Sequence, residues 1–387
     1  MLRVLTLSTL FPNDAQPTLG VFVERQTLGL AALKNVEVEV VAPIGVPPWP
    51  LSLHPHYKAR AKLPRRQTWK DIIVHRPAYP VLPRLGQRFT ARRMARALLP
   101  KLREIRARFP FDVIDAEFFW PDGPAAMHLA AALEVPFSIK ARGSDINYWG
   151  GRAGIGEQLL AAAGAAGGLL SVSESLKRAM VELGMNGDRI KVHYTGVDLE
   201  RFRPVDRRQA KAAIGIQGPL IATVAALIPG KGQRLALEAV ARIPGATLAL
   251  AGAGPDRAAL ESLAGALGIT GRVLFMGAQP HDSIARLLAA ADVMMLPSRS
   301  EGLANVWIEA MASGTPVVSG DVGGAREAIV PEAGTLVALT PEALAQAARD
   351  LIDIPRDQET VRKAALRFDW DTNSRILFEH LSRVANC

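Results

Sequence analysis

Two glutamates, Glu301 and Glu309, stand eight positions apart in the stretch "PSRSEGLANVWIEAMASGTPVV" (297–318). The pattern predicts a strand, a turn with Gly302, and then a helix. A helix N-terminus offers unpaired N–H groups and the positive end of the helix dipole, and a glycine lets the backbone approach an anion closely. We therefore expect a diphosphate to bind against Gly302, Leu303, Ala304 and Asn305.

The two carboxylates suit the groups that flank such a diphosphate. Glu309 lies about one helical turn beyond Asn305 on the same face, where it could accept two hydrogen bonds from a ribose diol. Glu301 could accept a hydrogen bond from a sugar hydroxyl, or stabilise positive charge that develops at an anomeric carbon. The structural alternative is an acidic first helical turn that complements the dipole, with Gly302 in an ordinary turn, and the segment alone leaves both open.

A lysine between glycines precedes another predicted helix, in "AALIPGKGQRLALEA" (225–239). Lys231 is placed to neutralise a diphosphate. The segment is not a P-loop, because "AALIPGKG" lacks the first glycine and Gly232 follows the lysine. A solvated turn lysine is the structural alternative.

Two further strand ends carry weaker signals. Gly252 and Gly254 follow the strand in "LALAGAGPDRAAL" (248–260), where Arg257 breaks the G-x-G-x-x-G pattern. Met276 and Gly277 end another strand and could present backbone polar atoms to a nucleobase. Two glycines after a strand are weak evidence by themselves, and packing explains Met276 and Gly277 equally well.

Short β-rich runs alternate with helix-length amphipathic stretches through most of the chain. We expect strands at 3–7, 38–42, 71–76, 112–116, 137–140, 169–172 and 190–194, then at 220–226, 247–252, 273–277, 293–297, 316–320 and 334–338. This alternation implies right-handed βαβ crossovers and mainly parallel sheets. Because so many strands in one sheet would be unusual, we expect two doubly wound α/β domains, 1–195 and 196–369. A helix at 370–387 has no strand after it and is expected to pack back on the first domain.

Two facing open α/β domains leave a cleft at the carboxyl ends of both sheets, where ligands bind in such folds. In the first domain a long loop (10–26) enters a helix at Gly20 and lacks the G-x-G-x-x-G of a dinucleotide-binding dehydrogenase. Arg142 and Asp145 follow the strand at 137–140 and are counted as catalytic candidates. We expect Arg142 to face the cleft, whereas helix capping is the structural alternative for Asp145.

Composition restricts the class of protein. Apolar residues make up 49% and charged residues 21%, as in ordinary globular proteins. The single cysteine, Cys387, excludes an internal disulfide and suits a reducing compartment. The N-terminal apolar run is short and leads into Pro12, so it predicts a buried strand rather than a signal peptide. With no apolar stretch of about 18 residues, nothing is expected to span a membrane. We expect a cytoplasmic protein.

The segment 58–108 carries 16 basic and 2 acidic residues. Within it, a helix over 88–109 places on one side the apolar residues Met94, Leu98, Leu102, Ile105 and Phe109, with arginines opposite. Pro100 is expected to kink or split this helix. Either the basic face is simply solvated, or it docks the protein peripherally on anionic lipid at the inner face of the cell membrane, which suits a lipid-linked acceptor. No nucleic-acid-binding module is recognisable.

Taken together, these segments resemble the retaining GT-B glycosyltransferases, glycosyltransferase family 4 in particular. The resemblance covers essentially the whole chain. It rests on "SEGLANVWIEAMASGTPVVSGDVGGARE" (300–327), which is similar to that family's E-x7-E motif with its trailing Gly-Gly-x-x-Glu, and on "PGKG", "LAGAGP", "VLFMG" and "TGVDLERFRP". Two positions depart from the family: Ala225-Ala226-Leu227 replaces the usual Gly-Arg-Leu, and Arg142 stands where histidine is common.

The resemblance implies two Rossmann-like domains facing across a cleft, with a UDP- or GDP-sugar donor bound mostly by the second. Lys231 and the amides of Leu303 and Ala304 would hold the diphosphate, and Gly20 would close from the other side. Glu309 would bind the ribose and Glu301 the donor sugar. Transfer with retention is implied. With no His/Cys cluster at metal-ligand spacing in the sequence, we expect no required metal and no cofactor.

The function expected from the sequence is sugar transfer to a glycan or lipid-linked acceptor, as in bacterial surface polysaccharide synthesis. Two alternatives stay open. One is a GT-B protein that binds nucleotide sugars with lost or altered activity, motivated by Ala226 and Arg142. The other is a nucleotide-sugar epimerase, against which the E-x7-E arrangement speaks.

Overall fold

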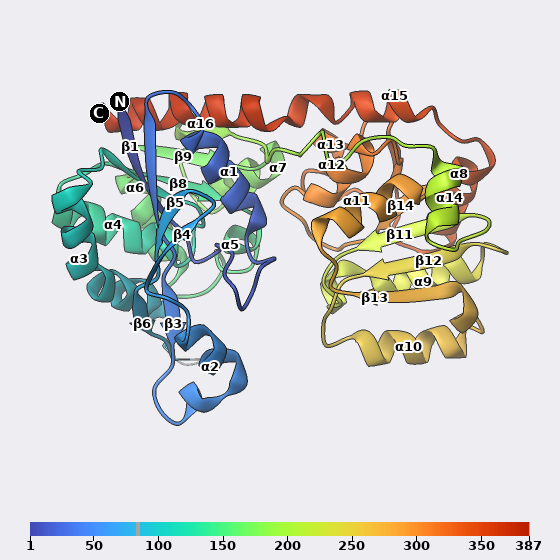
Figure 1. Cartoon of the computed structure of the whole chain (residues 1–387), viewed down its shortest axis with the longest axis horizontal. Helices are drawn as coiled ribbons and strands as arrows, with labels where there is room; N and C mark the ends of the chain where they lie inside the picture. The colour runs from blue at the N-terminus through green and yellow to red at the C-terminus, as the bar shows by residue number, and fades with distance from the viewer. Residues whose placement is uncertain (83–85, 387) are drawn as a thin grey trace. The chain divides into compact units, whose positions relative to one another are not determined.

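The computed structural model describes residues 1–82 and 86–386 (Figure 1). The chain divides into two compact units. Unit 1 comprises residues 1–196 together with 370–387, and unit 2 comprises residues 197–369. Each unit is an α/β structure built on its own sheet. The boundary expected from the sequence lies one residue from the division at Gly196 and Val197.

The sheet of unit 1 has the strand order β10-β9-β8-β7-β1-β2-β5-β4. All neighbours are parallel except β4 and β5. The strands are β1 (Leu2–Leu7), β2 (Val36–Val41), β4 (Arg66–Trp69), β5 (Ile72–His75), β7 (Val113–Ala116), β8 (Phe137–Ala141), β9 (Gly168–Ser171) and β10 (Ile190–Val192). The prediction of a mainly parallel sheet is confirmed, and each strand expected in this half forms.

Sequence analysis missed β4 and a small parallel ribbon of β3 (Ile44–Val46) and β6 (Ala78–Pro80). These strands are short, β6 ends in a proline, and β4 alternates exposed and half-buried residues. Such segments give little hydrophobic periodicity. Their positions are nevertheless important, because the ribbon β3–β6 extends from the carboxyl ends of β2 and β5.

The helices of unit 1 are α1 (Val21–Ala31), α2 (Pro55–Ala61), α3 (Thr90–Arg108), α4 (Asp122–Leu133), α5 (Ser144–Asn147), α6 (Gly156–Ala165), α7 (Glu174–Glu182) and α16 (Trp370–Ala385). In α3 the predicted apolar side is buried, whereas arginines such as Arg92 and Arg103 are exposed. The helix is not split at Pro100 as one prediction allowed. Because proline has no N–H, the carbonyl of Arg96 lacks its helical hydrogen bond from position 100. Arg96 and Pro100 are both exposed, so water can replace that bond.

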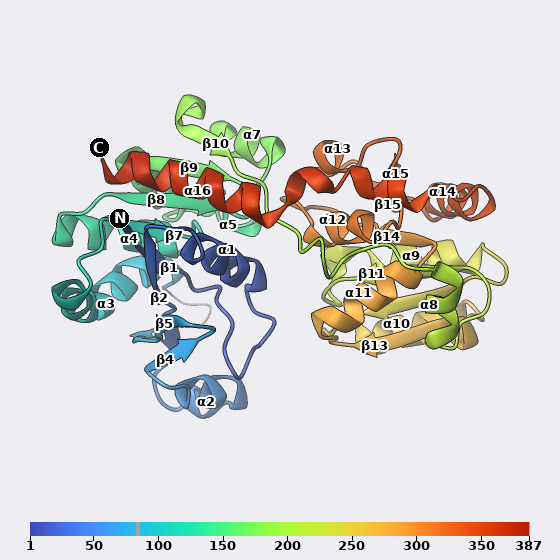
Figure 2. The same cartoon turned by 45° about the horizontal axis from the view of Figure 1, so that its top comes forward.

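The C-terminal helix α16 is part of the core of unit 1. Its residues Leu377, Leu381 and Val384 are buried in a cluster with residues of β1, β2, β7, β9 and α1. Figure 2 shows α16 running along α1 and across β8 and β9. Two glycines allow this close packing: a Cβ on Gly29 would lie 2.3 Å from Ser374 Oγ, and one on Gly168 would lie 2.5 Å from the His380 ring.

Unit 2 has a six-stranded, fully parallel sheet in the order β13-β12-β11-β14-β15-β16. Its strands are β11 (Leu220–Val224), β12 (Thr247–Ala251), β13 (Val273–Gly277), β14 (Val293–Leu296), β15 (Val317–Gly320) and β16 (Gly334–Val337), all expected from the sequence. Its helices are α8 (Arg207–Ala213), α9 (Gln233–Ala241), α10 (Arg257–Ala266), α11 (His281–Ala290), α12 (Asn305–Ala312), α13 (Ala325–Ala328), α14 (Pro341–Asp353) and α15 (Gln358–Lys363).

Each sheet has a point where the strand order reverses. In unit 2 the chain moves outward from β11 through β12 and β13, then returns to place β14 on the other side of β11. In unit 1, β2 and β7 flank β1 in the same way. Loops that leave the carboxyl ends at such a reversal diverge and leave room for a ligand. No helix in the described part of the chain is long and apolar enough to cross a bilayer.

Candidate functional site

The loops that follow β11 and β14 bring Lys231 and Glu301 into direct contact. The Lys231 ammonium lies 2.6 Å from Glu301 Oε1, and the two side chains are 28% and 10% exposed. Both residues therefore lie at the strand-order reversal of unit 2, although 70 positions separate them in the sequence. The sequence predicted that both would serve one ligand, and the structure places them together.

One glycine allows the loops to approach this closely. Gly232 has a φ of +73°, and a Cβ there would lie 2.0 Å from the carbonyl oxygen of Pro297. The same two loops are joined by a hydrogen bond from the Arg299 N–H to the Gly230 carbonyl at 3.0 Å. The "PGKG" segment is thus tied by its backbone to the loop that carries Glu301.

The trailing pair Gly323-Gly324 supports Glu301 from the other side. A Cβ on Gly323 would lie 1.9 Å from the carbonyl oxygen of Glu301, and the Gly324 N–H donates to the Gly302 carbonyl at 2.8 Å. These glycines act on the shape of the loop at 301–302. Backbone packing against residues 301–302 therefore explains why glycines occupy positions 323 and 324.

Helix α12 begins directly after this loop. Its N-cap residue, Ala304, supplies no capping side chain, so the first-turn N–H groups of the helix are not capped by its own end residue. Leu303 and Ala304 are buried, whereas Asn305 and Glu309 are half-buried. Glu309 Oε1 lies 4.0 Å from His281 Nδ1. The start of the helix thus lies one turn before a carboxylate, and its binding of an anion stays a prediction.

The four residues with weaker signals lie at neighbouring strand ends of the same sheet. A Cβ on Gly252 would lie 1.8 Å from the Ala225 carbonyl oxygen, and one on Gly254 would lie 2.2 Å from that of Leu227. The Met276 carbonyl accepts from Gln279 Nε2 at 2.6 Å, and the Gly277 carbonyl accepts from the Gly252 N–H at 2.8 Å. Internal contacts therefore account for these residues, and their binding roles stay predictions.

In unit 1, Arg142 lies inside the protein rather than on an open surface. Its side chain is 5% exposed and forms an ion pair with Glu117, whose backbone carbonyl it also contacts at 3.2 Å. The guanidinium lies 4.9 Å from the Phe22 ring centroid. Burial lowers the pKa of Arg142 to about 10. Glu117 thus neutralises the charge of Arg142 inside the protein, and a role of Arg142 at a ligand stays a prediction.

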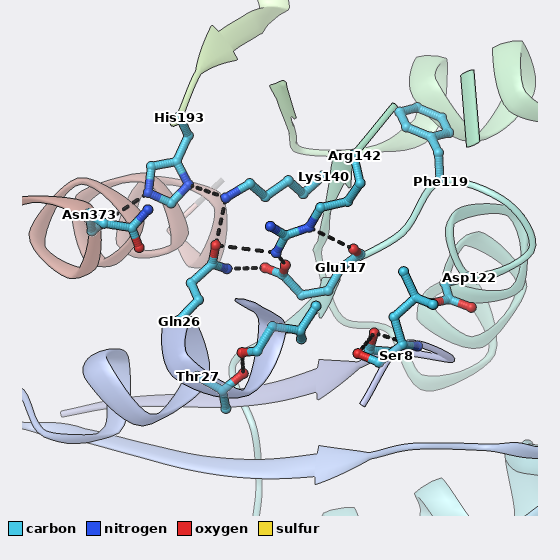
Figure 3. A network of polar contacts seen from close by, with 12 residues as sticks. Ser8, Gln26, Thr27, Glu117, Phe119, Asp122, Lys140, Arg142, His193 and Asn373 are labelled. Carbon is cyan, nitrogen blue, oxygen red and sulfur yellow. Dashed lines mark hydrogen bonds and ion pairs between the residues drawn. The ribbon is translucent and has the colours of Figure 1, made fainter. Parts of the chain in front are cut away.

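A buried polar network surrounds this ion pair (Figure 3). Gln26 of α1 bonds to Glu117 and accepts from the Lys140 ammonium at 2.6 Å. Lys140 also lies 2.8 Å from His193 Nδ1, and His193 Nε2 lies 2.9 Å from the carbonyl of Asn373 in α16. Burial lowers the pKa of Lys140 to about 7 and holds that of His193 well below its usual value. The network joins α1, the sheet and α16.

Sequence reasoning did not find Glu117, Gln26 or His193. Glu117 had a detectable signal, since it directly follows the apolar strand β7 at the same sheet edge as Arg142. Lys140 also had a detectable signal, because it is a cation near the end of a buried strand. Gln26 and His193 carried none, because their importance arises only when distant elements pack together.

Asp145 and Gly20 shape the backbone of the same edge. The buried Asp145 carboxylate accepts from the N–H groups of Phe119 at 2.8 Å, Arg142 at 3.0 Å and Gly143 at 2.7 Å. Burial raises its pKa, and these bonds oppose the rise. The geometry favours the structural interpretation of Asp145, and its catalytic role stays a prediction. Gly20 has a φ of +64°, and a Cβ there would lie 2.3 Å from the Leu10 carbonyl oxygen.

Two protein-family models match the chain. "Glycosyl transferases group 1" matches residues 206–368, and "Glycosyltransferase Family 4" matches residues 19–201. The D-inositol 3-phosphate glycosyltransferases of Mycobacterium bovis and Mycobacterium tuberculosis are 39% identical over 169 residues. That match takes in 42% of this chain and 35% of the relatives, so it spans about a third of their length.

Solved structures of similar fold cover nearly the whole chain. Sucrose-phosphate synthase from Thermosynechococcus elongatus superposes with a TM-score of 0.79 at 20% identity, covering 99% of both chains. Anabaena Alr3699/HepE in complex with UDP superposes with a TM-score of 0.76 at 21% identity, covering 99% of this chain and 100% of that one. At these identities the likeness shows the fold, and the GT-B architecture expected from the sequence is confirmed.

Proposed function

Because this chain belongs to the GT-B glycosyltransferases, we propose that it transfers a sugar from a nucleotide-diphosphate sugar to a glycan or lipid-linked acceptor, with retention at the anomeric carbon. The observation that carries the proposal is the contact of Lys231 with Glu301 at 2.6 Å, beside the start of α12, whose N-cap residue supplies no capping side chain. This arrangement offers a cation and helix amides to a diphosphate, and carboxylates to the hydroxyl groups on either side of it.

In the proposed reaction the bond between the anomeric carbon and the diphosphate breaks, an acceptor hydroxyl oxygen bonds to that carbon, and the hydroxyl proton passes to the leaving diphosphate. Negative charge develops on the leaving diphosphate, where Lys231 and the first-turn amides of α12 stabilise it. Glu301 holds the sugar, and Glu309 holds the ribose. Because these groups supply the positive charge, we infer that no metal ion is required.

We further propose that the acceptor is used at a membrane surface, as in bacterial surface polysaccharide synthesis. The support is the exposed basic side of α3, including Arg92, Arg96 and Arg103, whose apolar side is occupied by the core of unit 1. Such a face attracts anionic lipid by charge alone. Flotation with vesicles that contain anionic lipid should carry the protein upward, and equal flotation with neutral vesicles would contradict this part.

The reaction is tested by incubating the protein with UDP- and GDP-sugars and an acceptor panel. We expect release of nucleoside diphosphate that depends on acceptor, unchanged anomeric configuration in the product by NMR, and unchanged rate in EDTA. A product of inverted configuration would contradict retention, and loss of the rate in EDTA would contradict metal independence. Nucleotide-sugar binding without release would favour a binding protein instead.

A further inference from the structure

Unit 1 contains a cavity of about 270 Å³ that none of the roles above uses. It lies where the chain leaves β1, β2 and β5, and its walls come from the loop after β1, the ribbon β3–β6 and helix α2. One buried water needs only about 10–15 Å³ of such space. The volume is therefore large enough for a group the size of a monosaccharide.

Arg76 gives the cavity a buried positive charge. Its side chain is among the largest in the protein that are fully buried, with 1% exposure. The guanidinium donates to the Pro12 carbonyl at 2.8 Å and to Gln67 Oε1 at 3.4 Å, and both acceptors are neutral. No carboxylate in residues 1–82 or 86–386 lies within ion-pair distance of it. The Asp14 carboxylate favours the charged form of Arg76 only from beyond ion-pair distance. The charge of this buried cation is therefore incompletely compensated, and an anion in the cavity would stabilise it.

A second cation lines the same cavity. Arg60 of α2 is half-buried beside Tyr57 and Tyr79, and burial lowers its pKa. Within the described chain it also lacks a carboxylate at ion-pair distance. Two arginines in the lining of one cavity favour a ligand with a phosphate or a carboxylate, whose oxygens match the guanidinium geometry.

The cavity lining also includes a side-chain oxygen that accepts no hydrogen bond. Gln16 Oε1 is buried and has no hydrogen-bond partner in the described structure. Asn13, beside it, uses its own oxygen to hold the turn through the N–H groups of Ala15 and Gln16. Gln16 therefore points to a ligand that carries a donor, such as a hydroxyl, as well as an anion.

The fold keeps this space open with a glycine. Gly45 pairs with Tyr79 in the ribbon β3–β6, and a Cβ on Gly45 would lie 2.8 Å from Val81 Cγ1 and 3.4 Å from the Tyr79 ring. In Figure 1, α2 lies beside this ribbon. The cavity is thus formed in part by β3 and β6, two strands that the apolar pattern of the sequence did not reveal.

We propose that this cavity binds a monosaccharide unit bearing a phosphate or carboxylate, and that this unit belongs to the acceptor. Arg60 and Arg76 would hold the anionic group, and Gln16 a hydroxyl. The assignment to the acceptor rests on the proposed sugar transfer, since the cavity and Gly20 occupy the same sheet edge. Binding of the charged sugar itself does not depend on any reaction.

Binding is tested by calorimetry with glucose 6-phosphate, glucuronate and neutral glucose. The key variant is Arg60→Gln, because a half-buried side chain can be exchanged without emptying the core. Lys58→Gln removes the same charge from an exposed position of the same helix and serves as the matched control. Lys231→Ala tests whether the phosphate binds in unit 2 instead.

We expect wild type to bind at least one of the two anionic sugars more tightly than glucose, and which of them binds identifies the anion. Arg60→Gln should weaken that binding about 10- to 100-fold, the equivalent of a hydrogen bond to a charged group. Lys58→Gln and Lys231→Ala should bind like wild type. The inference is overturned if neither anionic sugar binds, if glucose binds equally well, or if Arg60→Gln has no effect. If a charged sugar binds through Arg60 but the protein has no transferase activity, the proposed function is contradicted and the binding site is not.

Discussion

At the scale of single residues, the two glutamates of unit 2 have separable roles in the account. Glu309→Gln keeps the shape of the side chain but removes its charge, so the bonds to a ribose diol should weaken. We expect about tenfold weaker UDP binding, with pyrophosphate binding unchanged because pyrophosphate has no ribose. Equilibrium dialysis with both ligands measures this, and an equal loss for both would assign Glu309 to the diphosphate instead.

The substitution Glu301→Gln tests the proposed contact with the donor sugar. It should leave UDP binding within a few-fold of wild type while lowering the affinity for UDP-glucose or another donor that the protein accepts. The ion pair with Lys231 would be lost in this variant, so Lys231 would be freer to meet the diphosphate. A large loss of UDP affinity would show that Glu301 acts chiefly by positioning the lysine.

Asp122 makes a residue-scale prediction about pH. Burial raises the pKa of this carboxyl to about 7, against 3.8 in an exposed chain, although the Thr9 N–H at 2.8 Å opposes the rise. The folded protein therefore keeps a proton that the unfolded chain releases, and stability should fall as pH rises from about 4 to about 7. Asp122→Asn removes this titration. Urea unfolding at pH 5 and pH 7.5 should show wild type losing stability relative to the variant, by up to a few kcal/mol. If the stabilities of wild type and Asp122→Asn change equally between the two pH values, the raised pKa of Asp122 is contradicted.

At the scale of elements, the loop "PGKG" offers a matched pair of glycines. Gly232→Ala would place a Cβ 2.0 Å from the Pro297 carbonyl at a positive φ, whereas a Cβ on Gly230 meets nothing within 4 Å. We expect Gly232→Ala to lower the free energy of unfolding by about 1–3 kcal/mol and to weaken UDP binding, because the loops of Lys231 and Glu301 must separate. Gly230→Ala should be close to neutral in both measurements. Equal effects of the two changes would contradict the close approach.

The elements also show what the sequence could and could not predict. All the strands expected from apolar periodicity form, and the loop residues Lys231 and Glu301 meet, because parallel strands bring their carboxyl ends to one edge. Periodicity did not reveal β3, β4 or β6, which are short and incompletely buried. It also could not foresee that Glu117 would neutralise Arg142, since that pair depends on how β7 and β8 lie side by side.

At the scale of the whole molecule, α16 makes the N-terminal unit depend on the last residues of the chain. Leu377→Ala would leave a cavity in the cluster that includes β1 and β9, and should cost about 2–5 kcal/mol of unfolding free energy. Hydrogen exchange should show the loss in peptides of unit 1, with unit 2 little changed. Arg375→Ala, at a side chain 63% exposed, is the control. Equal loss of protection in both units would mean that they unfold together.

The central claim is that Lys231 and the start of α12 hold the diphosphate of a nucleotide sugar. Its most direct test is calorimetric titration of UDP and GDP into wild type, Lys231→Ala and Arg234→Ala, the last being an exposed arginine of the following helix. The account predicts that wild type and Arg234→Ala bind one of the nucleotides alike, and that Lys231→Ala binds it about 10- to 100-fold more weakly. Unchanged affinity in Lys231→Ala, or no binding of either nucleotide to wild type, would contradict it.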